Sequence, residues 1–455
     1  MRYQSMDELK SSLQGAVEIG EIDGKVRVVN QEKLRGQSID RLVFNGVFHE
    51  NDEIKQAARS LVRKSAGALG IHSASILPLY EARGRGECGG FTVPAINIRG
   101  LTYDMARAVF RAALRHQVGA LIFEIARSEI GYTYQRPAEY AHAVMAAAIK
   151  EGFSGPLFIQ GDHFQASQKN FAKNPQAEVQ ALKDLIKEAI EAEFFNIDID
   201  SSTLVDLSKP TVRAQQQDNC EVAAELTAFL RPLEPKGVSI SVGGEIGEVG
   251  GKNSTVEELE AFMAGYREEL DKRGRGFKGI SKISVQTGTT HGGVPLPDGT
   301  IARVKIDFDT LGKLSQVSRE KYGLAGAVQH GASTLPEEAF DHFPRRDCAE
   351  IHLATGFQNM LYDDPGFPQE AKKEIYDHLR KECAVEKKEG ETDEQFIYKT
   401  RKKGFGPLKE KFWGLPEGFR KEIGRKLEER FEFLFKKLNV VNTVSLVREK
   451  VPLLK

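Results

Sequence analysis

The chain has 455 residues, with 64 lysines and arginines against 65 aspartates and glutamates, and so a formal charge of −1 at pH 7. Hydrophobic residues make up 40% of it and charged residues 28%, which is ordinary globular composition rather than that of a disordered or fibrous protein. The near-zero charge argues against a general nucleic-acid binder, which usually carries a basic excess. No window approaches the roughly 18 consecutive apolar residues that a membrane span needs.

Two further features of the sequence predict a cytoplasmic protein. The start of the chain, MRYQSMDELKSSLQ, has no apolar core behind a basic patch, so we expect no signal peptide. The four cysteines show no CxxC spacing, which is typical of reduced thiols in a cytoplasm.

Residues 1–75 are interpreted as an N-terminal α/β extension. The apolar spacing of residues 6–13 and 51–70 predicts amphipathic helices, and residues 25–30 and 41–48 have the composition of short strands. No chemical cluster is evident in this part of the chain.

Residues 76–364 show a regular alternation of short apolar segments with helices or long connections. Helical spacing is found at 102–116, 137–151, 175–192 and 216–230, and the strand candidates are eight: 92–98, 120–126, 156–163, 194–200, 237–247, 281–288, 323–331 and 349–356. Such alternation indicates parallel pairing with both faces of the sheet covered. Eight units over roughly 290 residues predict an α/β fold of the (β/α)8 TIM-barrel type. A doubly wound open sheet is the alternative, but eight units would be many for it.

Residues 365–455 are dense in Lys, Glu and Phe at helical spacing, which predicts a C-terminal helical extension packed on the barrel or on a partner subunit. Because the Phe-rich helices offer an apolar face, we expect a homo-oligomer. The basic run TRKKG at 400–404 is interpreted as a solvated helix face rather than a nucleic-acid patch.

Histidines follow three of the predicted strands, at the end of the barrel where such folds carry their active sites. Three histidines converging on one rim favour a metal site over three separate hydrogen-bonding residues. Neutral imidazoles suit Zn²⁺, which in catalytic sites keeps three protein ligands and one open position. We therefore predict a zinc site of His163, His291 and His330, with Glu245 or Asp198 as supporting or second-metal groups. Another divalent metal is the alternative.

Glycine-rich loops with hydroxyl side chains follow the last three predicted strands. Backbone N–H groups at such turns bind anions, and the late loops of barrels often hold a phosphate. Gly292, Gly331, Ser333 and Thr355 are therefore candidate phosphate-binding residues, although glycine in one loop could serve only a tight turn. No P-loop or dinucleotide fingerprint occurs, because RGRGECGG at 83–90 lacks the preceding strand.

With these motifs in order, the region from about residue 76 to about 364 resembles the class II, metal-dependent fructose-bisphosphate aldolase family. The resemblance rests on FTVPAINI, GDHF, FFNIDID, GGEIGEVGG, QTGTTHGG, VKIDFDTL, VQHGASTLP and IHLATGFQ. It implies a carbon–carbon lyase of carbohydrate metabolism: a zinc-dependent aldolase that reversibly cleaves a ketose (bis)phosphate through a metal-stabilised enediolate. It also implies a sugar phosphate as the small-molecule partner.

The resemblance assigns roles to the metal-site residues. His163, His291 and His330 match the family's zinc ligands, while Glu245 and Asp198 match its additional metal-associated carboxylates.

The resemblance also assigns roles at the substrate. Asp162 matches the acid/base aspartate that handles the hydroxyl proton at the bond being cleaved. Gly292, Gly331 and Ser333 match the phosphate-binding positions, and Asn97 matches a substrate-proximal asparagine.

Two local arguments agree with this assignment. A Schiff-base lysine would be the other solution for aldol chemistry, but Lys282 lies at the start of the sixth predicted strand, away from the predicted rim. Asp162 and His163 are neighbours, and strand alternation would point them in opposite directions. We therefore expect the strand to end and the backbone to turn at these two residues.

The chain departs from the family where a mobile acidic loop usually carries the glutamate that transfers a proton. The matching stretch here is Gly250-Gly251-Lys252-Asn253, so that glutamate is absent, and Glu124 and Glu248 are the available catalytic replacements. Glu124 could instead form a barrel-interior ion pair, and Glu248 could be a surface loop residue. Three further positions differ from the residues common in the family: Ala126, His352 and Gly356.

A missing base beside an intact metal motif leaves alternatives open. One is an aldolase with a different proton shuttle and a different sugar phosphate. Another is a metal-dependent ketose or ketose-phosphate epimerase on the same scaffold. A third is a non-catalytic relative that keeps the fold, against which the intact GDH, THGG and QHGAS motifs argue.

Overall fold

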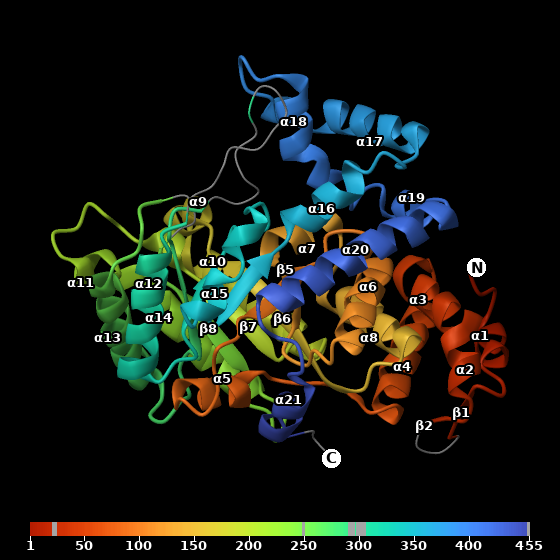
Figure 1. The fold of residues 1–455 in the computed structure, drawn as a ribbon, viewed down its shortest axis with the longest axis horizontal. Helices are drawn as coiled ribbons and strands as arrows, with labels where there is room; N and C mark the ends of the chain where they lie inside the picture. The colour runs from red at the N-terminus through yellow and green to blue at the C-terminus, as the bar shows by residue number, and fades with distance from the viewer. Residues whose placement is uncertain (21–24, 248–250, 290–295, 297–305, 453–455) are drawn as a thin grey trace.

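A closed parallel barrel forms the centre of the computed structural model, which describes residues 1–20, 25–247, 251–289, 296 and 306–452 (Figure 1). Each barrel strand pairs in parallel with the next one along the chain, and the last pairs with the first, so the predicted (β/α)8 barrel is confirmed. The strands are β4 (Val93–Asn97), β5 (Ile122–Ala126), β6 (Gly155–Gln165), β7 (Asn196–Asp200), β8 (Ser241–Glu245), β9 (Lys282–Val285), β10 (Ala327–Gln329) and β11 (Glu350–Leu353).

Helices surround the barrel and cover its outer, apolar face, as parallel sheets require. They are α6 (Thr102–Arg115), α7 (Arg127–Thr133), α8 (Pro137–Glu151), α9 (Gln168–Lys173), α10 (Pro175–Glu191), α11 (Val212–Gln215), α12 (Gln217–Leu230), α13 (Val256–Arg273), α14 (Phe308–Tyr322), α15 (His342–Arg345) and α16 (Thr355–Tyr362). Short 3₁₀ turns are η2 (Ser202–Leu204), η3 (Arg231–Leu233) and η4 (Glu337–Ala339). The helices predicted at 102–116, 137–151, 175–192 and 216–230 are all present. At the start of α13, Thr255 Oγ1 accepts from Glu258 N while Glu258 Oε2 accepts from Thr255 N, a reciprocal capping box.

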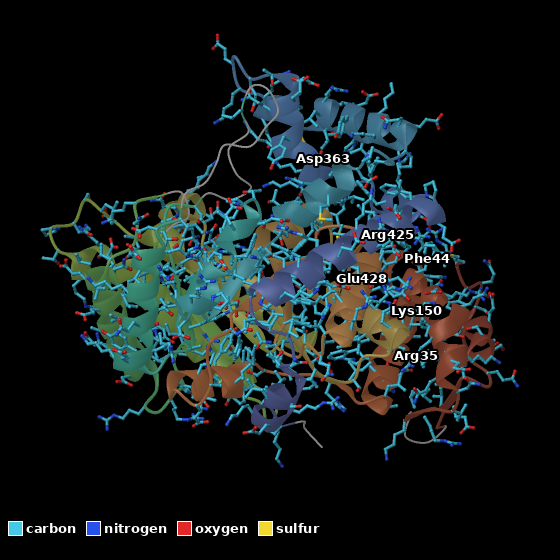
Figure 2. The ribbon with its side chains drawn as sticks, in the orientation of Figure 1. Arg35, Phe44, Lys150, Asp363, Arg425 and Glu428 are labelled. Atoms are coloured by element: carbon cyan, nitrogen blue, oxygen red, sulfur yellow. The ribbon has the colours of Figure 1, made fainter. Side chains whose placement is uncertain are left out.

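The N-terminal extension packs against α8 on one side of the barrel (Figure 1). Its elements are α1 (Met6–Ser12), β1 (Val17–Ile19), β2 (Val26–Val28), α2 (Gln31–Lys33), the π-helical turn η1 (Leu34–Ser38), α3 (Ile39–Phe48), α4 (Asp52–Ala68) and β3 (Ile71–Ser73). The next helix, α5 (Leu77–Gly84), follows the extension and contacts α14. Lys150 of α8 donates to Asp40 Oδ2 at 2.7 Å, and Arg35 donates to the carbonyl of Ile149 at 3.0 Å; Lys150 and Arg35 are labelled in Figure 2. β3 extends the sheet outside the barrel, because it pairs in parallel with the first residues of β6.

The prediction of a strand at residues 41–48 is wrong, because this segment lies in α3. Its valines and phenylalanines favour strands by composition, but Leu42, Val43 and Val47 share one buried face that packs against α4 and α8. Tertiary packing has overridden a weak local preference.

The C-terminal extension is helical, as predicted, and its longest helix, α20, lies across α6 and α16 (Figure 1). Glu428 of α20, labelled in Figure 2, accepts from Arg111 Nε and Arg115 Nη2 of α6, both at 2.6 Å. Phe431 is fully buried beside Phe357, with ring centroids 4.8 Å apart. The apolar face of this helix therefore packs on the barrel's own helices. The elements are α17 (Gln369–Glu382), η5 (Ala384–Glu386), α18 (Asp393–Thr400), η6 (Arg401–Gly404), α19 (Lys409–Trp413), α20 (Glu417–Lys437) and α21 (Val444–Lys450).

In the described part of the chain, no helix combines the length and the apolar character that crossing a bilayer requires. The four cysteines are free thiols, in agreement with their spacing. The boundaries at about residues 75 and 364, the cytoplasmic location and the association of copies stay predictions.

Phe431→Ala is expected to lower the free energy of unfolding by about 3–5 kcal/mol, because it opens a cavity between α20 and α16. Chemical denaturation followed by circular dichroism measures this. As a control in the same extension, Val385→Ala removes a side chain that is 95% exposed and should change stability by less than about 0.5 kcal/mol. Equal effects of the two substitutions would contradict the packing of α20 on the barrel.

Candidate active site

A β-bulge in β6 allows two neighbouring residues, Asp162 and His163, to reach the same site. The register between β6 and β7 shifts between Gly161 and Phe164, and His163 has a positive φ of 39°. Strand β6 does not end here, as we expected, but continues to Gln165. The alternation of side chains is instead broken inside the strand, which is how a bulge redirects a residue.

The rings of His163 and His330 lie together above the barrel, with centroids 4.0 Å apart. The Nε2 atom of each ring faces Asp162 Oδ1, at 3.9 Å from His163 and 4.0 Å from His330. On the other side of its ring, His163 Nδ1 lies 2.8 Å from Asp200 Oδ2 and 3.3 Å from Glu245 Oε2. Glu245 Oε1 also lies 3.7 Å from His330 Nδ1. Two imidazoles and three carboxylates therefore meet at the carboxyl ends of β6, β7, β8 and β10.

Asp162 is buried, and both of its oxygens are held. Asn97 Nδ2 donates to Oδ2 at 2.9 Å, and Oδ1 lies 3.1 Å from His352 Nδ1. Burial alone would raise the pKa of Asp162, but the facing rings of His163 and His352 more than offset it and hold that pKa well below its usual range. Asp162 is therefore a carboxylate at neutral pH, able to accept a proton.

A second cluster of charges lies deeper in the barrel and is organised by Lys282. Its ammonium contacts Asp198 Oδ2 at 3.0 Å, donates to Gln160 Oε1 at 2.8 Å and pairs with Glu350. Burial would lower the pKa of Lys282, but the carboxylates of Asp198 and Glu350 outweigh it and raise that pKa. Glu350 also accepts from the hydroxyl of Tyr80. Lys282 is thus a permanent cation that neutralises the floor of the site.

The two aspartates of β7 belong to different layers. Asp198 and Asp200 point to the same side because they are two residues apart, and about 6–7 Å of strand separates them. Asp200 reaches His163, whereas Asp198 lies beside Lys282. Asp200 is thus the aspartate of β7 that contacts His163, while Asp198 Oδ2 lies 3.7 Å from His352 Nε2, and the metal role of Asp198 stays a prediction.

Glu124 lies in the same buried layer as Lys282, below the pocket. Its Oε2 accepts from Gln160 Nε2 at 2.8 Å, and its Oε1 lies 3.1 Å from His352 Nδ1. Burial raises the pKa of Glu124 to about 8, although the neighbouring His352 opposes this rise. Glu124 was considered either as a catalytic residue or as a member of an ion pair inside the barrel. Its buried contacts agree with the second interpretation.

A cavity of about 500 Å³ opens above these groups, which is within the usual range for a small-molecule site. Seven of the predicted site residues line it: Asn97, Asp162, His163, His330, Gly331, Ser333 and Thr355. Three others lie beneath it or to its side and are not among its lining residues: Glu124, Asp198 and Glu245. His291, Gly292 and Glu248 lie outside the described residues.

The donor set fits a divalent cation. One ligand atom from each of Asp162, His163 and His330 can be chosen so that all lie within 4.8 Å of one another, and the same holds for His163, Asp200 and Glu245. Imidazole nitrogens with carboxylate oxygens are the ligands that zinc and similar ions take in proteins. A metal-binding histidine commonly gives its second nitrogen to a carboxylate, which is the contact between His163 and Asp200.

Four residues of the site were not predicted from the sequence to be functional: Arg99, Glu129, Asp200 and His352. Arg99 Nε donates to Glu129 Oε1 at 2.6 Å, and Glu129 Oε2 accepts from Asn97 at 2.9 Å. Arg99 follows the first predicted strand directly, so its position in the sequence was the available signal. His352 is a histidine within an otherwise apolar predicted strand, and that position could have indicated a functional role.

Comparison with known proteins agrees with this geometry. Residues 83–402, more than two thirds of the chain, match the family described as fructose-bisphosphate aldolase class-II. The chain therefore belongs to the class II fructose-bisphosphate aldolase family. A search of the curated proteins found no match.

The solved structures that align with this chain are only distantly similar to it in sequence. A protein named a probable tagatose 6 phosphate kinase, from Sinorhizobium meliloti 1021, aligns with a TM-score of 0.54 at 16% identity, covering 79% of this chain and 98% of its own. The YdjI aldolase from Escherichia coli K12 aligns at 0.48 and 15% identity, covering 82% and 100%. Fructose-bisphosphate aldolase (Fba) from Campylobacter jejuni aligns at 0.49 and 18% identity, covering 82% and 96%.

Lys282→Met is expected to lower the free energy of unfolding by about 3–5 kcal/mol, because it leaves Asp198 and Glu350 buried without their cation. Denaturant titration of the purified protein measures the loss. Lys313→Met, at an exposed position on α14, is the matched control and should shift stability by less than about 0.5 kcal/mol. A Lys282→Met protein as stable as the control would show that the buried charges do not depend on this lysine.

Proposed function

We propose that the protein is a metal-dependent aldolase that reversibly cleaves a ketose phosphate or bisphosphate. The observation that carries the proposal is the convergence of Asp162, His163 and His330 on one cavity in a chain of the class II aldolase family. Zinc is the proposed ion, because His163, His330 and the sequence-predicted His291 would form a three-histidine set that zinc favours. Bound there, the ion would act as a Lewis acid toward negative charge developing on the substrate oxygens.

Asp162 is the proposed acid/base residue. In the cleavage direction its carboxylate would accept the proton of the hydroxyl at the carbon whose bond breaks, and in condensation it would return that proton. Asn97 and His352 each hold one of its oxygens, so the carboxylate is oriented before the substrate arrives. Such fixed orientation is a large part of what an active site contributes to a rate.

Lys282 supports the metal route over Schiff-base chemistry. A lysine nucleophile must lose its proton, which requires a lowered pKa. The contacts with Asp198 and Glu350 raise the pKa of Lys282, so its amine is held in the ammonium form.

Glu124 is proposed to position His352 rather than to touch the substrate. The contacts run from Glu124 through His352 to Asp162, and Glu124 does not line the cavity. Glu248 stays a prediction for the second proton-transfer group.

The loops after β10 and β11 are proposed to bind a substrate phosphate. Gly331 has a positive φ of 67°, which turns its loop sharply, and Ser333 Oγ accepts from the Ala354 amide at 2.6 Å. Thr355 begins α16 and lines the same cavity. Backbone amides and hydroxyls at such turns form anion sites, to which the sequence-predicted Gly292 would add.

The proposal predicts that purified protein releases a triose phosphate from a ketose phosphate, and that Asp162→Asn lowers this turnover at least about a hundredfold. Because the proposed metal ligands are the three histidines and Asp162 is the proposed acid/base residue, the metal content should be unchanged. A coupled dehydrogenase assay over a panel of ketose phosphates measures release, and elemental analysis measures the metal. Asp309→Asn, whose side chain is 96% exposed, is the control and should behave as wild type.

Chromatography of the same reactions separates the alternatives. If an epimer of the substrate accumulates and no three-carbon fragment is released, the protein is an epimerase and the aldolase proposal is rejected. Unchanged turnover in Asp162→Asn would return Asp162 to a structural role.

Asp200 is proposed to support the metal in place of Asp198. Asp200→Asn should weaken divalent-metal affinity by about 10–100-fold, because it removes the carboxylate that fixes the ring of His163. Asp198→Asn, two residues away on the same strand, should leave that affinity near wild type. Competition with a chromophoric chelator measures both affinities. The reverse order of effects would restore Asp198 to the metal site.

A further inference from the structure

The C-terminal extension reaches the rim of the active site through η6. Among the residues that line the active-site cavity, Lys402 is the one contributed by the region after residue 364 in the described chain. From its composition, the surrounding basic run TRKKG was expected to form a solvated helix face. In the structure, Thr400 and Arg401 are buried and Lys402 is half-buried.

Close backbone contacts fix this segment over the ends of β4 and β5. A Cβ atom at Gly100, just after β4, would come within 2.2 Å of the Phe405 ring. A Cβ atom at Gly406 would come within 2.4 Å of the Tyr132 carbonyl oxygen, at the end of α7. Lys409 Nζ donates to the carbonyl of Tyr134 at 2.8 Å. The extension is therefore seated on the loops that form the cavity wall.

Three successive cations of η6 point to three different places, as expected for a helix with three residues per turn. Arg401 pairs with Asp363, which Figure 2 labels, and so anchors the segment to the end of α16. Lys403 pairs with Glu386 at 2.6 Å on the surface. Lys402 lies between them and faces the cavity.

Lys402 is a cation without a counter-ion in the described chain. No described carboxylate lies within 4.0 Å of its ammonium, which instead lies 5.6 Å from the centroid of the Tyr132 ring. Burial, and next the charge of Arg99, lower the pKa of Lys402, and the more distant carboxylates of Glu129 and Glu386 oppose this without offsetting it. A half-buried ammonium beside a second cation is costly unless an anion binds there.

The surroundings of Lys402 offer hydrogen-bond donors in surplus. Arg99 uses Nε for Glu129 and Nη1 for Thr355 and Gln358, at 3.0 and 3.1 Å, and its Nη2 makes no hydrogen bond to a described residue. The buried hydroxyl of Tyr132 lies close enough to this guanidinium for Arg99 to oppose the rise that burial causes in its pKa, but it makes no hydrogen bond of normal geometry to a described residue. Charged donors of this kind form strong bonds to phosphate.

We propose that Lys402, together with Arg99 and Tyr132, binds a phosphate group of the substrate, so that the C-terminal extension contributes directly to substrate recognition. This inference rests on the proposed function and adds a cationic wall to the loops after β10 and β11. It identifies the substrate class as one whose phosphate lies against α7 and η6. Lys402 is a binding residue in this account and takes no part in proton transfer.

Inorganic phosphate is the probe for the test, because it requires no knowledge of the sugar. Isothermal titration of the full-length protein with phosphate should show binding that Lys402→Met weakens by about ten- to a hundredfold, as expected for a charge-assisted contact. Lys402→Arg, which keeps the charge, should retain most of the affinity. Lys403→Met removes the adjacent lysine, which points to the surface, and should bind phosphate as wild type.

Thermal unfolding without phosphate separates binding from folding. Lys402→Met should unfold at the wild-type temperature or above it, because it removes a half-buried ammonium that has no counter-ion. Wild-type phosphate affinity in Lys402→Met, equal weakening in Lys403→Met, or a lowered unfolding temperature of Lys402→Met without phosphate would each overturn the proposal.

The outcomes also distinguish this inference from the proposed function. Cleavage of ketose phosphates by a wild-type protein whose phosphate affinity does not depend on Lys402 would leave the aldolase standing and remove the inference. Phosphate binding that depends on Lys402, in a protein that cleaves no ketose phosphate, would support the anion site and reject the aldolase.

Discussion

Buried negative charge inside the barrel is the main physical constraint on this protein. Six carboxylates are buried on its strands: Glu124, Asp162, Asp198, Asp200, Glu245 and Glu350. Taking a charge out of water is costly unless it is paired or protonated. In the lower layer, formed by Glu124, Asp198, Lys282 and Glu350, the ammonium of Lys282 pairs with the carboxylates of Asp198 and Glu350. Burial raises the pKa of Glu124 to about 8 and so favours its protonated form. In the upper layer, formed by Asp162, Asp200 and Glu245 on the side of the cavity, the carboxylates contact the rings of His163 and His330, and the cation that we propose would balance their negative charge.

This division into two layers explains the geometry of the site. The bulge in β6 lifts His163 toward Asp200 and Glu245 while leaving Asp162 directed at the cavity. His352 connects the layers, because it contacts Asp162 above and Glu350 below. A substrate in the cavity would therefore contact the oriented carboxylate of Asp162 and the candidate metal ligands, while Lys282 balances the carboxylates of Asp198 and Glu350 below them.

Much of the fold followed from the sequence, because parallel barrel strands are short apolar runs separated by helices, and each of the eight predicted strands is present. The strand predicted at residues 41–48 was wrong, because the helix found there depends on packing against α4 and α8. Asp162, His163 and His330 were predictable because each comes directly after a short apolar run, although β6 continues past the first two. Asp198 and Asp200 share a face of β7 and differ only in depth, which the sequence does not show. The partners of Lys282 come from β6, β7 and β11, and no local pattern shows such contacts.

Elemental analysis measures whether the upper layer holds the proposed divalent cation, and its result does not depend on the substrate. The full-length protein should be purified without chelator and measured by mass spectrometry for zinc and other divalent ions. We expect at least about one divalent ion per chain, with most of it lost in His330→Ala and retained in His378→Ala, which replaces a histidine on α17 outside the site. A wild-type protein without a stoichiometric divalent ion would show that the imidazoles and carboxylates of the upper layer do not form a metal site.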